Sequence, residues 1–350
     1  MLDTIGEPIV LALIGLVGGV LLGLAARMGR FCSLGAIEDG LYGGDWTRMR
    51  MWSFAIGLSI LGTFGAQSLG LAEIGRTVYL AQDWNPWASI LGGLAFGYGM
   101  ALAGNCGFGA LARVGGGDFR SFVIVITVGL AAYATLSGPF AEWRVALFPD
   151  SRATTPQGLA HAVASLTGLA PALPAFAAGV AMVALALANR GFRGSPRTVF
   201  WSAAVAVAIV SGWLGTTWVA RHGFAATPIV SHTYAAPLGE AMLYLMTASG
   251  RSVSFGVGSV AGVLLGAFAG SLVRGHFRWE ACEDPRELRR QIGGAVLMGA
   301  GAVVAVGCTV GQGLSAFSLL AYSAPVTAAA IFAGAAVGLR QLITGFLPAE

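Results

Sequence analysis

The sequence has 350 residues, of which 56% are hydrophobic and only 10% are charged, and its formal net charge is +4. A soluble globular protein has roughly 25% charged residues, so this chain lacks the polar surface needed to cover a core in water. The mean hydropathy of +0.76 indicates a membrane protein. The positive charge comes from scattered arginines and does not indicate nucleic-acid binding.

Hydrophobic segments long enough to cross a hydrocarbon core of about 30 Å recur along the whole chain. No polar linker divides them, so residues 1–350 are expected to form a single membrane domain. The sequence predicts an all-α, polytopic membrane protein with about nine transmembrane helices and short re-entrant broken helices. The expected spans are residues 9–26, 51–71, 87–105, 119–137, 173–189, 199–220, 255–273, 291–307 and 324–344.

The arginines predict an orientation in a cell inner (plasma) membrane. Fifteen of the twenty lie in the loops after spans 1, 3, 5 and 7 or near the C-terminus. Cytoplasmic loops are enriched in basic residues, so the N-terminus is expected outside and the C-terminus in the cytoplasm. The first residues lack the pattern of a cleaved signal peptide, and none is expected. The five arginines on the other side are Arg76, Arg144, Arg152, Arg221 and Arg251.

Two parts of the chain resemble each other. The glycine-rich run 19–23 recurs at 262–266, and both runs belong to small-residue ridges that predict close helix packing. A Gly-Gly pair followed by an apolar run to cysteine occurs at 92–106 and again at 293–308. In the expected topology these two cysteine units are inverted, as in many transporters, although glycine-rich helices also look alike by chance. The expected pseudo-repeats are approximately 9–137 and 255–344, with connecting spans at 173–220.

Three cysteines stand where a predicted span is interrupted by glycine-rich sequence. They are Cys32, Cys106 and Cys308. A single cysteine in an apolar helix is usually a packing residue. Irregular backbone at membrane depth is tolerated only where it is buried in protein or lines a cavity. Three cysteines at three such interruptions therefore indicate a substrate pathway.

The interruptions favour a small anion with soft sulfur chemistry. A helix that restarts after Cys106 or Cys308 directs free N–H groups and its positive dipole end toward the interruption. The carbonyls of the preceding helix leave cation coordination open, but no membrane-embedded carboxylate accompanies them. Neutral thiols are weak S–H donors and polarisable acceptors. Such groups bind a sulfur-containing anion without trapping it, as transport requires.

Further pathway candidates adjoin the central cysteines. Asn105 and Gln312 offer amides to an oxyanion, and Gly107 and Thr309 directly follow the two cysteines. Arg113, two helical turns after Cys106, either attracts an anion or simply follows the distribution of basic residues.

Other residues carry no predicted chemistry. The four histidines, His161, His222, His232 and His276, fall in loops without metal-ligand spacing and are expected to have ordinary solvent or interface roles. Cys282 is expected to be a reduced surface thiol. No catalytic residue, metal site or cofactor is predicted, and no phosphate-binding loop for ATP is present. The segments 138–172 and 221–250 receive no function.

The segments GNCGFGAL at 104–111 and GCTVGQGLS at 307–315, with the Arg30-Phe31-Cys32 run, resemble the cysteine motifs of the YeeE/YedE sulfur-transport family. The resemblance implies thiosulfate uptake into the cytoplasm through an hourglass-shaped protein whose loops dip toward its centre. It implies successive S–H contacts of Cys106, Cys308 and Cys32 with the ion. It also implies cooperation with a cytoplasmic TusA-type sulfur-carrier protein. The motifs do not distinguish thiosulfate from other small sulfur or selenium species.

Two other classes of membrane protein remain open. A membrane thiol oxidoreductase or sulfurtransferase needs an exchanging cysteine pair, usually C-x-x-C, and none occurs. A pore of the aquaporin kind also has inverted repeats and dipping loops, but it does not require cysteine at all three interruptions.

Overall fold

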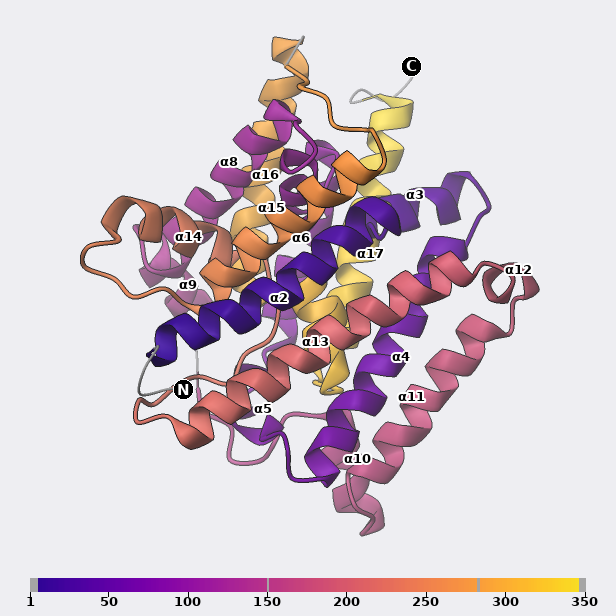
Figure 1. The fold of residues 1–350 in the computed structure, drawn as a ribbon, viewed down its shortest axis with the longest axis vertical. Coiled ribbons are helices and arrows are strands. Elements are labelled where there is room, and N and C mark those ends of the chain that lie inside the picture. The colour runs from indigo at the N-terminus through magenta and orange to yellow at the C-terminus, as the bar shows by residue number, and fades with distance from the viewer. Residues whose placement is uncertain (1–5, 150, 282–283, 346–350) are drawn as a thin grey trace.

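The computed structural model describes residues 6–149, 151–281 and 284–345, and within these ranges the protein is helical without a β-strand. Figure 1 shows long helices lying side by side, with shorter helices and loops at their ends and between them. The helices are α2 (Glu7–Met28), α3 (Ser33–Tyr42), α4 (Thr47–Ser68), η1 (Ile74–Arg76), α5 (Val78–Ala81), α6 (Pro86–Ala103), α7 (Gly107–Val114), α8 (Phe119–Leu136), α9 (Ala141–Leu147), α10 (Leu159–Thr167), α11 (Ala172–Leu187), α12 (Arg190–Arg193), α13 (Pro196–His222), α14 (Ala236–Thr247), α15 (Phe255–Val273), α16 (Pro285–Val304), the π-helix η2 (Gly311–Ala316) and α17 (Ser323–Thr344).

Each predicted span lies on one long helix of the structure. Six segments of the described chain are long and apolar enough to cross a membrane: α2 with α3, α6 with α7, α8, α13, α15 and α17. The helices α4, α11 and α16 fall short in length or hydropathy, so their crossing stays a prediction. The all-α, polytopic membrane fold is confirmed.

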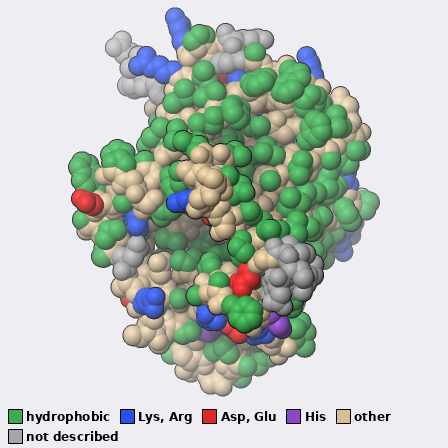
Figure 2. Space-filling view, turned by 60° about the vertical axis from the view of Figure 1, so that its left-hand side comes forward, with side chains coloured by type: hydrophobic (Ala, Val, Ile, Leu, Met, Phe, Trp, Pro, Cys, Tyr) green, Lys and Arg blue, Asp and Glu red, His purple; other side chains and the backbone are tan. Residues whose placement is uncertain are grey.

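Hydrophobic side chains cover much of the outer surface. Figure 2 shows broad hydrophobic areas, with arginines at the top of the view and a mixed charged group near the bottom. Large apolar side chains are exposed even in the middle of long helices. In water such surface is costly, and around helices of this length it indicates contact with lipid. Examples from α2, α8, α13, α15 and α17 are Val17, Leu130, Val207, Leu265 and Val337.

Glycines bring α2 and α15 into backbone contact, as the sequence predicts for its small-residue ridges. The two helices run parallel and side by side (Figure 1). A Cβ atom on Gly19 would collide with the Ser259 carbonyl, and one on Gly262 with the Leu16 carbonyl. Because lipid supplies no hydrophobic drive between helices, such close van der Waals packing holds them together.

The two helices that lead to the central cysteines pack antiparallel. Gly92, near the start of α6, lies against Ala305 at the end of α16. Farther along α6, Gly99 lies against Met298. The helices α6 and α16 therefore have opposite directions, whereas α2 and α15 have the same direction. The boundaries of the pseudo-repeats and the single-domain assignment stay predictions.

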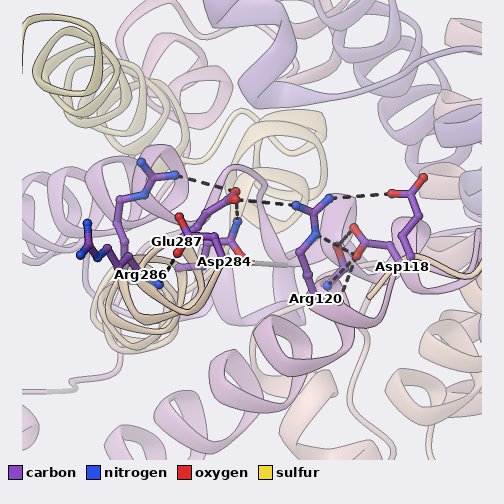
Figure 3. Close-up of polar contacts among 9 residues, drawn as sticks. Asp118, Arg120, Asp284, Arg286 and Glu287 are labelled. Atoms are coloured by element: carbon purple, nitrogen blue, oxygen red, sulfur yellow. Dashed lines mark hydrogen bonds and ion pairs between the residues drawn. The ribbon is translucent and has the colours of Figure 1, made fainter. Parts of the chain in front are cut away.

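Ion pairs tie together the starts of α8 and α16. Figure 3 shows Arg120 between Asp118 and Glu287. Its guanidinium nitrogens lie 3.6 Å from a carboxylate oxygen of Asp118 and 3.8 Å from one of Glu287, with Glu280 also at 3.8 Å. These ion pairs hold together the end of the molecule that the chain reaches after Cys106 and α7.

Substitution of Gly258→Ala should destabilise the protein by roughly 1–3 kcal/mol, the usual cost of overpacking. A Cβ atom there collides with the Ala12 carbonyl of α2. Gly65→Ala is the matched control, because no atom lies within 4 Å of that Cβ position. Melting in detergent, followed by size-exclusion chromatography, measures both. Equal melting temperatures would contradict the helix packing.

Acid should weaken the ion pair that joins the segment after α4 to the end of α13. Arg221 Nε donates to Glu73 Oε1 at 2.7 Å, and this hydrogen bond, with Arg76, lowers the pKa of Glu73. A lowered folded-state pKa contributes stability above the unfolded value of about 4.3 and loses it as pH falls. Glu73→Gln should therefore cost at most about 1 kcal/mol at pH 7, because the pair is exposed. In melting curves this difference should shrink as pH falls below about 4.3 and through the lowered pKa of Glu73; a constant difference would refute it.

Candidate functional site

The three cysteines occupy equivalent positions in three interruptions of the backbone, which we call the cysteine breaks: 30–35, 104–109 and 306–311. In each break the residue two positions before the cysteine has a positive φ. The values are 58° at Arg30, 75° at Gly104 and 55° at Val306. Non-glycine residues rarely adopt this conformation, so the surrounding structure must hold two of the breaks in place. A new helical segment then starts directly after each cysteine.

Each thiol faces the first turn of the helix that follows it. The Gly109 N–H donates to Cys106 Sγ at 3.3 Å, and the Gly311 N–H donates to Cys308 Sγ at 3.5 Å. At Cys32 no capping hydrogen bond forms, but the Gly35 N–H interacts with the sulfur. The sequence carries this pattern as C-x-x-G three times, at 32–35, 106–109 and 308–311, and this spacing is a signal for all three breaks.

The capping geometry leaves the thiol hydrogens available. A thiol has one hydrogen to donate, and its sulfur also accepts. At Cys106 and Cys308 the sulfur accepts a backbone N–H, so the S–H hydrogen is directed to another acceptor. Helix starts also place free N–H groups and positive dipole ends at these positions. The breaks therefore present several weak donors to a bound anion.

A loop that the sequence leaves without a function lies between the two central cysteines. The Tyr234 N–H donates to Cys308 Sγ at 3.2 Å, and Thr233 Oγ1 lies 3.6 Å from the same sulfur. A Cβ atom on Gly107 would lie 3.3 Å from the Tyr234 carbonyl oxygen. The Tyr234 ring packs on Phe108 with centroids 5.2 Å apart. The loop between α13 and α14 thus contacts the second and third breaks together.

The three thiols gather in one region of the molecule. Cys106 and Cys308 are buried, and Cys32 is half-buried. Cys106 is close enough to interact electrostatically with both Cys32 and Cys308. Arg113 is exposed near the end of α7 and interacts with Cys32. Cys282 lies outside the described residues.

Two buried polar atoms beside the central cysteines lack hydrogen-bond partners. They are Asn105 Nδ2 and Thr309 Oγ1, and both side chains are almost fully buried. Most buried polar atoms in proteins are hydrogen-bonded, because desolvation without a partner is costly. Donors left open next to thiol groups are consistent with a ligand that completes them.

Cavities flank the third break. Thr309 lines a largely apolar cavity of about 140 Å³ between α3, α4, η2 and α17, together with Ser33 and Trp52. Val306 lines a second cavity of about 60 Å³, which also contains Tyr79 and residues near the start of α17. The third cysteine break therefore lies between two hollow regions.

Gln312 braces the third break. Its Nε2 donates to the carbonyls of Ala305 at 2.8 Å and Val306 at 3.1 Å, and its Oε1 accepts from Ser323 at 3.0 Å. The donors of this amide are thus committed to the carbonyls of the two residues that directly follow α16, where a helix end leaves carbonyls without partners. This geometry favours a supporting role over the direct contact with an oxyanion that the sequence suggests.

The end of α2 is fixed by cations just before the first break. The Met28 carbonyl accepts from Arg197 Nη2 at 2.7 Å and from Arg274 at 2.6 Å. Cations stabilise the negative end of a helix, so these arginines hold the chain where it turns toward Cys32.

The expectation for the histidines is wrong in part. His161 lies in α10 and His222 ends α13, so neither is in a loop. His232 is in a loop, yet its side chain is fully buried rather than facing solvent. Loop position alone does not show burial when the loop dips between helices.

Replacing Gln312 with leucine should destabilise the protein by roughly 1–3 kcal/mol for each buried carbonyl left without a donor. Gln157→Leu is the control, since that amide donates to Thr155 in an exposed loop. Melting of both purified variants in detergent tests the brace. Unchanged stability of Gln312→Leu would show that the break holds without it.

The chain is similar to known proteins over most of its length. Residues 28–337 match the family described as sulphur transport. The thiosulfate transporter TsuA of Spirochaeta thermophila is 27% identical over 318 residues, which cover 88% of this chain and 92% of the relative. The thiosulfate transporter TsuA of Escherichia coli K12 is 27% identical over 315 residues, covering 86% of each chain. The chain belongs to the sulphur-transport family.

Proposed function

We propose that this protein imports thiosulfate, or a closely related sulfur anion, into the cytoplasm along a pathway through the cysteine breaks. The observation that carries the proposal is the repeated geometry of the breaks, in which a thiol stands directly before a helix start. The relatives named thiosulfate transporters support the choice of substrate.

The pathway acts through weak donors in an environment of low dielectric. A desolvated anion needs hydrogen bonds, and the S–H groups, the Asn105 amide and the Thr309 hydroxyl supply them. Thiols bond less strongly than hydroxyls, so the ion moves from one site to the next without a deep trap. The protein binds and releases the ion without a covalent step, and it is therefore no enzyme.

The arginine distribution gives the proposed orientation of the pathway, and the resemblance to the sulfur-transport family gives the direction of import. With the N-terminus outside and the C-terminus in the cytoplasm of the inner membrane, the cavity at Val306 faces outward. The ion then reaches Cys308 and Cys106 before Cys32, which lies nearest the cytoplasm. Arg113 interacts with Cys32 and attracts the anion toward this exit. A TusA-type carrier there takes up the delivered sulfur.

A sulfurtransferase or thiol oxidoreductase is the second candidate, because three thiols gather in one region. Cys32, Cys106 and Cys308 are all free in the structure, and no C-x-x-C pair occurs in the sequence. Both observations favour transport. A persulfide on any of these thiols during turnover, found by mass spectrometry, would favour the second candidate.

Substitution of Cys106→Ala or Cys308→Ala should slow uptake of radiolabelled thiosulfate into proteoliposomes by roughly 10- to 100-fold. Loss of a hydrogen bond to a charged group costs about 1.5–3 kcal/mol, which corresponds to this range. Sulfate, sulfite and selenite as competitors define the natural substrate. Uptake at the wild-type rate by both variants would refute the proposal.

Two further variants sharpen this experiment. Cysteine-to-serine substitution at 106 or 308 should restore little activity, because a hydroxyl binds more strongly and releases the ion more slowly. Full activity of the serine variants would remove the argument from soft sulfur chemistry. Cys282→Ala is the matched control and should transport normally.

A further inference from the structure

His232 is a buried imidazole with one nitrogen left open. Its side chain is fully buried in the loop between α13 and α14. Nδ1 lies 2.7 Å from Ser259 Oγ, which donates to the Tyr234 hydroxyl at 2.9 Å. Since Ser259 gives its hydrogen to Tyr234, its oxygen accepts from His232 Nδ1–H, and the ring lone pair is on Nε2. Among the residues that the structure describes, Nε2 has no hydrogen-bond partner.

The fold makes room for this ring at the parallel pair α2 and α15. A Cβ atom on Gly18 of α2 would collide with Nε2. The ring packs on Phe255 of α15 with centroids 5.0 Å apart. From α13, the Ala208 carbonyl is close enough to interact with the imidazole.

No charged side chain faces the imidazole in the described contacts. The neighbours from α2, α13 and α15 are Gly18, Ala208, Ser259 and Phe255, and none of them titrates. The titratable groups nearby are the Tyr234 phenol on the same loop and the Cys308 thiol, which contacts Tyr234.

A cleft with two carboxylates in its lining lies near the loop that carries His232. It has a volume of about 590 Å³ and lies at the starts of α2 and α15. Glu7 and Glu240 line it, and so do Val230 and Phe255, which connect it to His232 by sequence and by ring contact. Carboxylates concentrate cations and protons at such an entrance.

Hydrogen bonds also connect the backbone of His232 and the next two residues to the third cysteine break. The His232 carbonyl accepts from Ser315 Oγ of η2 at 2.7 Å. The next two residues, Thr233 and Tyr234, contact Cys308 Sγ. A positive charge on the imidazole would therefore lie one residue from Thr233 and two residues from Tyr234, which contact the Cys308 sulfur.

We propose that His232 is a proton-binding site that couples proton entry to movement of the anion, an inference that rests on the proposed transport function. A proton from the carboxylate-lined cleft binds the free lone pair of Nε2. The imidazolium then donates from Nδ1 to Ser259. Its positive charge attracts the anion to Cys308, and the proton leaves with the anion, so one proton accompanies each anion.

Proteoliposomes with an internal pH-sensitive dye test this coupling. In the wild type, an acidic exterior should accelerate thiosulfate uptake several-fold, and added thiosulfate should acidify the interior. His232→Gln keeps an amide that donates to Ser259 but cannot take up a proton. In this variant, thiosulfate uptake should no longer respond to the pH gradient, and the thiosulfate-driven acidification should fall at least threefold. His276→Gln, on an exposed loop, is the control and should behave as the wild type.

The outcomes separate this inference from the proposed function. Uptake of thiosulfate without acidification in the wild type overturns the coupling and leaves the transport function intact. Absence of uptake in the wild type overturns both. Because the wild-type measurement needs no variant, misfolding of His232→Gln does not prevent the decision. In that case Ser259→Ala, which frees Nδ1, should also weaken the response, and a full response would count against the inference.

Discussion

The hydrogen bond from a backbone N–H to a cysteine sulfur is the interaction on which the cysteine breaks depend. A helix interrupted inside a membrane exposes N–H and C=O groups that lipid cannot satisfy. At Cys106 and Cys308 the sulfur caps the helix that restarts, and at the third break Gln312 caps the helix that ends. With both sides of the interruption satisfied, a left-handed residue such as Val306 can be maintained there.

The choice of cap decides what the break can bind. Serine or aspartate caps a helix well, but a carboxylate would repel an anion and a hydroxyl would hold it more tightly. A thiol caps weakly and donates weakly, so under the proposed function the breaks at Cys106 and Cys308 exchange some stability for a shallow binding site. The surrounding packing compensates, since glycines such as Gly107 let the Tyr234 loop approach the main chain and close around both central cysteines.

Hydropathy was enough to place the long helices, because lipid imposes a length and an apolar surface on each of them. The breaks at Cys32, Cys106 and Cys308 were also predictable, because glycine next to cysteine interrupts a helical pattern. The roles of Tyr234 and His232 were not. Their burial comes from how α2, α13 and α15 pack around a loop of mixed composition. The hydrogen bonds of Gln312 likewise depend on the direction in which its amide points, and the spacing of residues in the sequence does not specify that direction.

Import of a dianion, as proposed, must work against a membrane potential that is negative inside. Each elementary charge costs about 2.3 kcal/mol for every 100 mV, so two charges cost roughly twice that amount. A ladder of weak S–H contacts lowers the barriers along the pathway but supplies none of this energy. A proton moving inward with the ion cancels one of its two charges. Under the proposed coupling, the His232 imidazole would carry this compensating charge. It lies on the same loop as the contacts to Cys308, the thiol proposed to hold the ion.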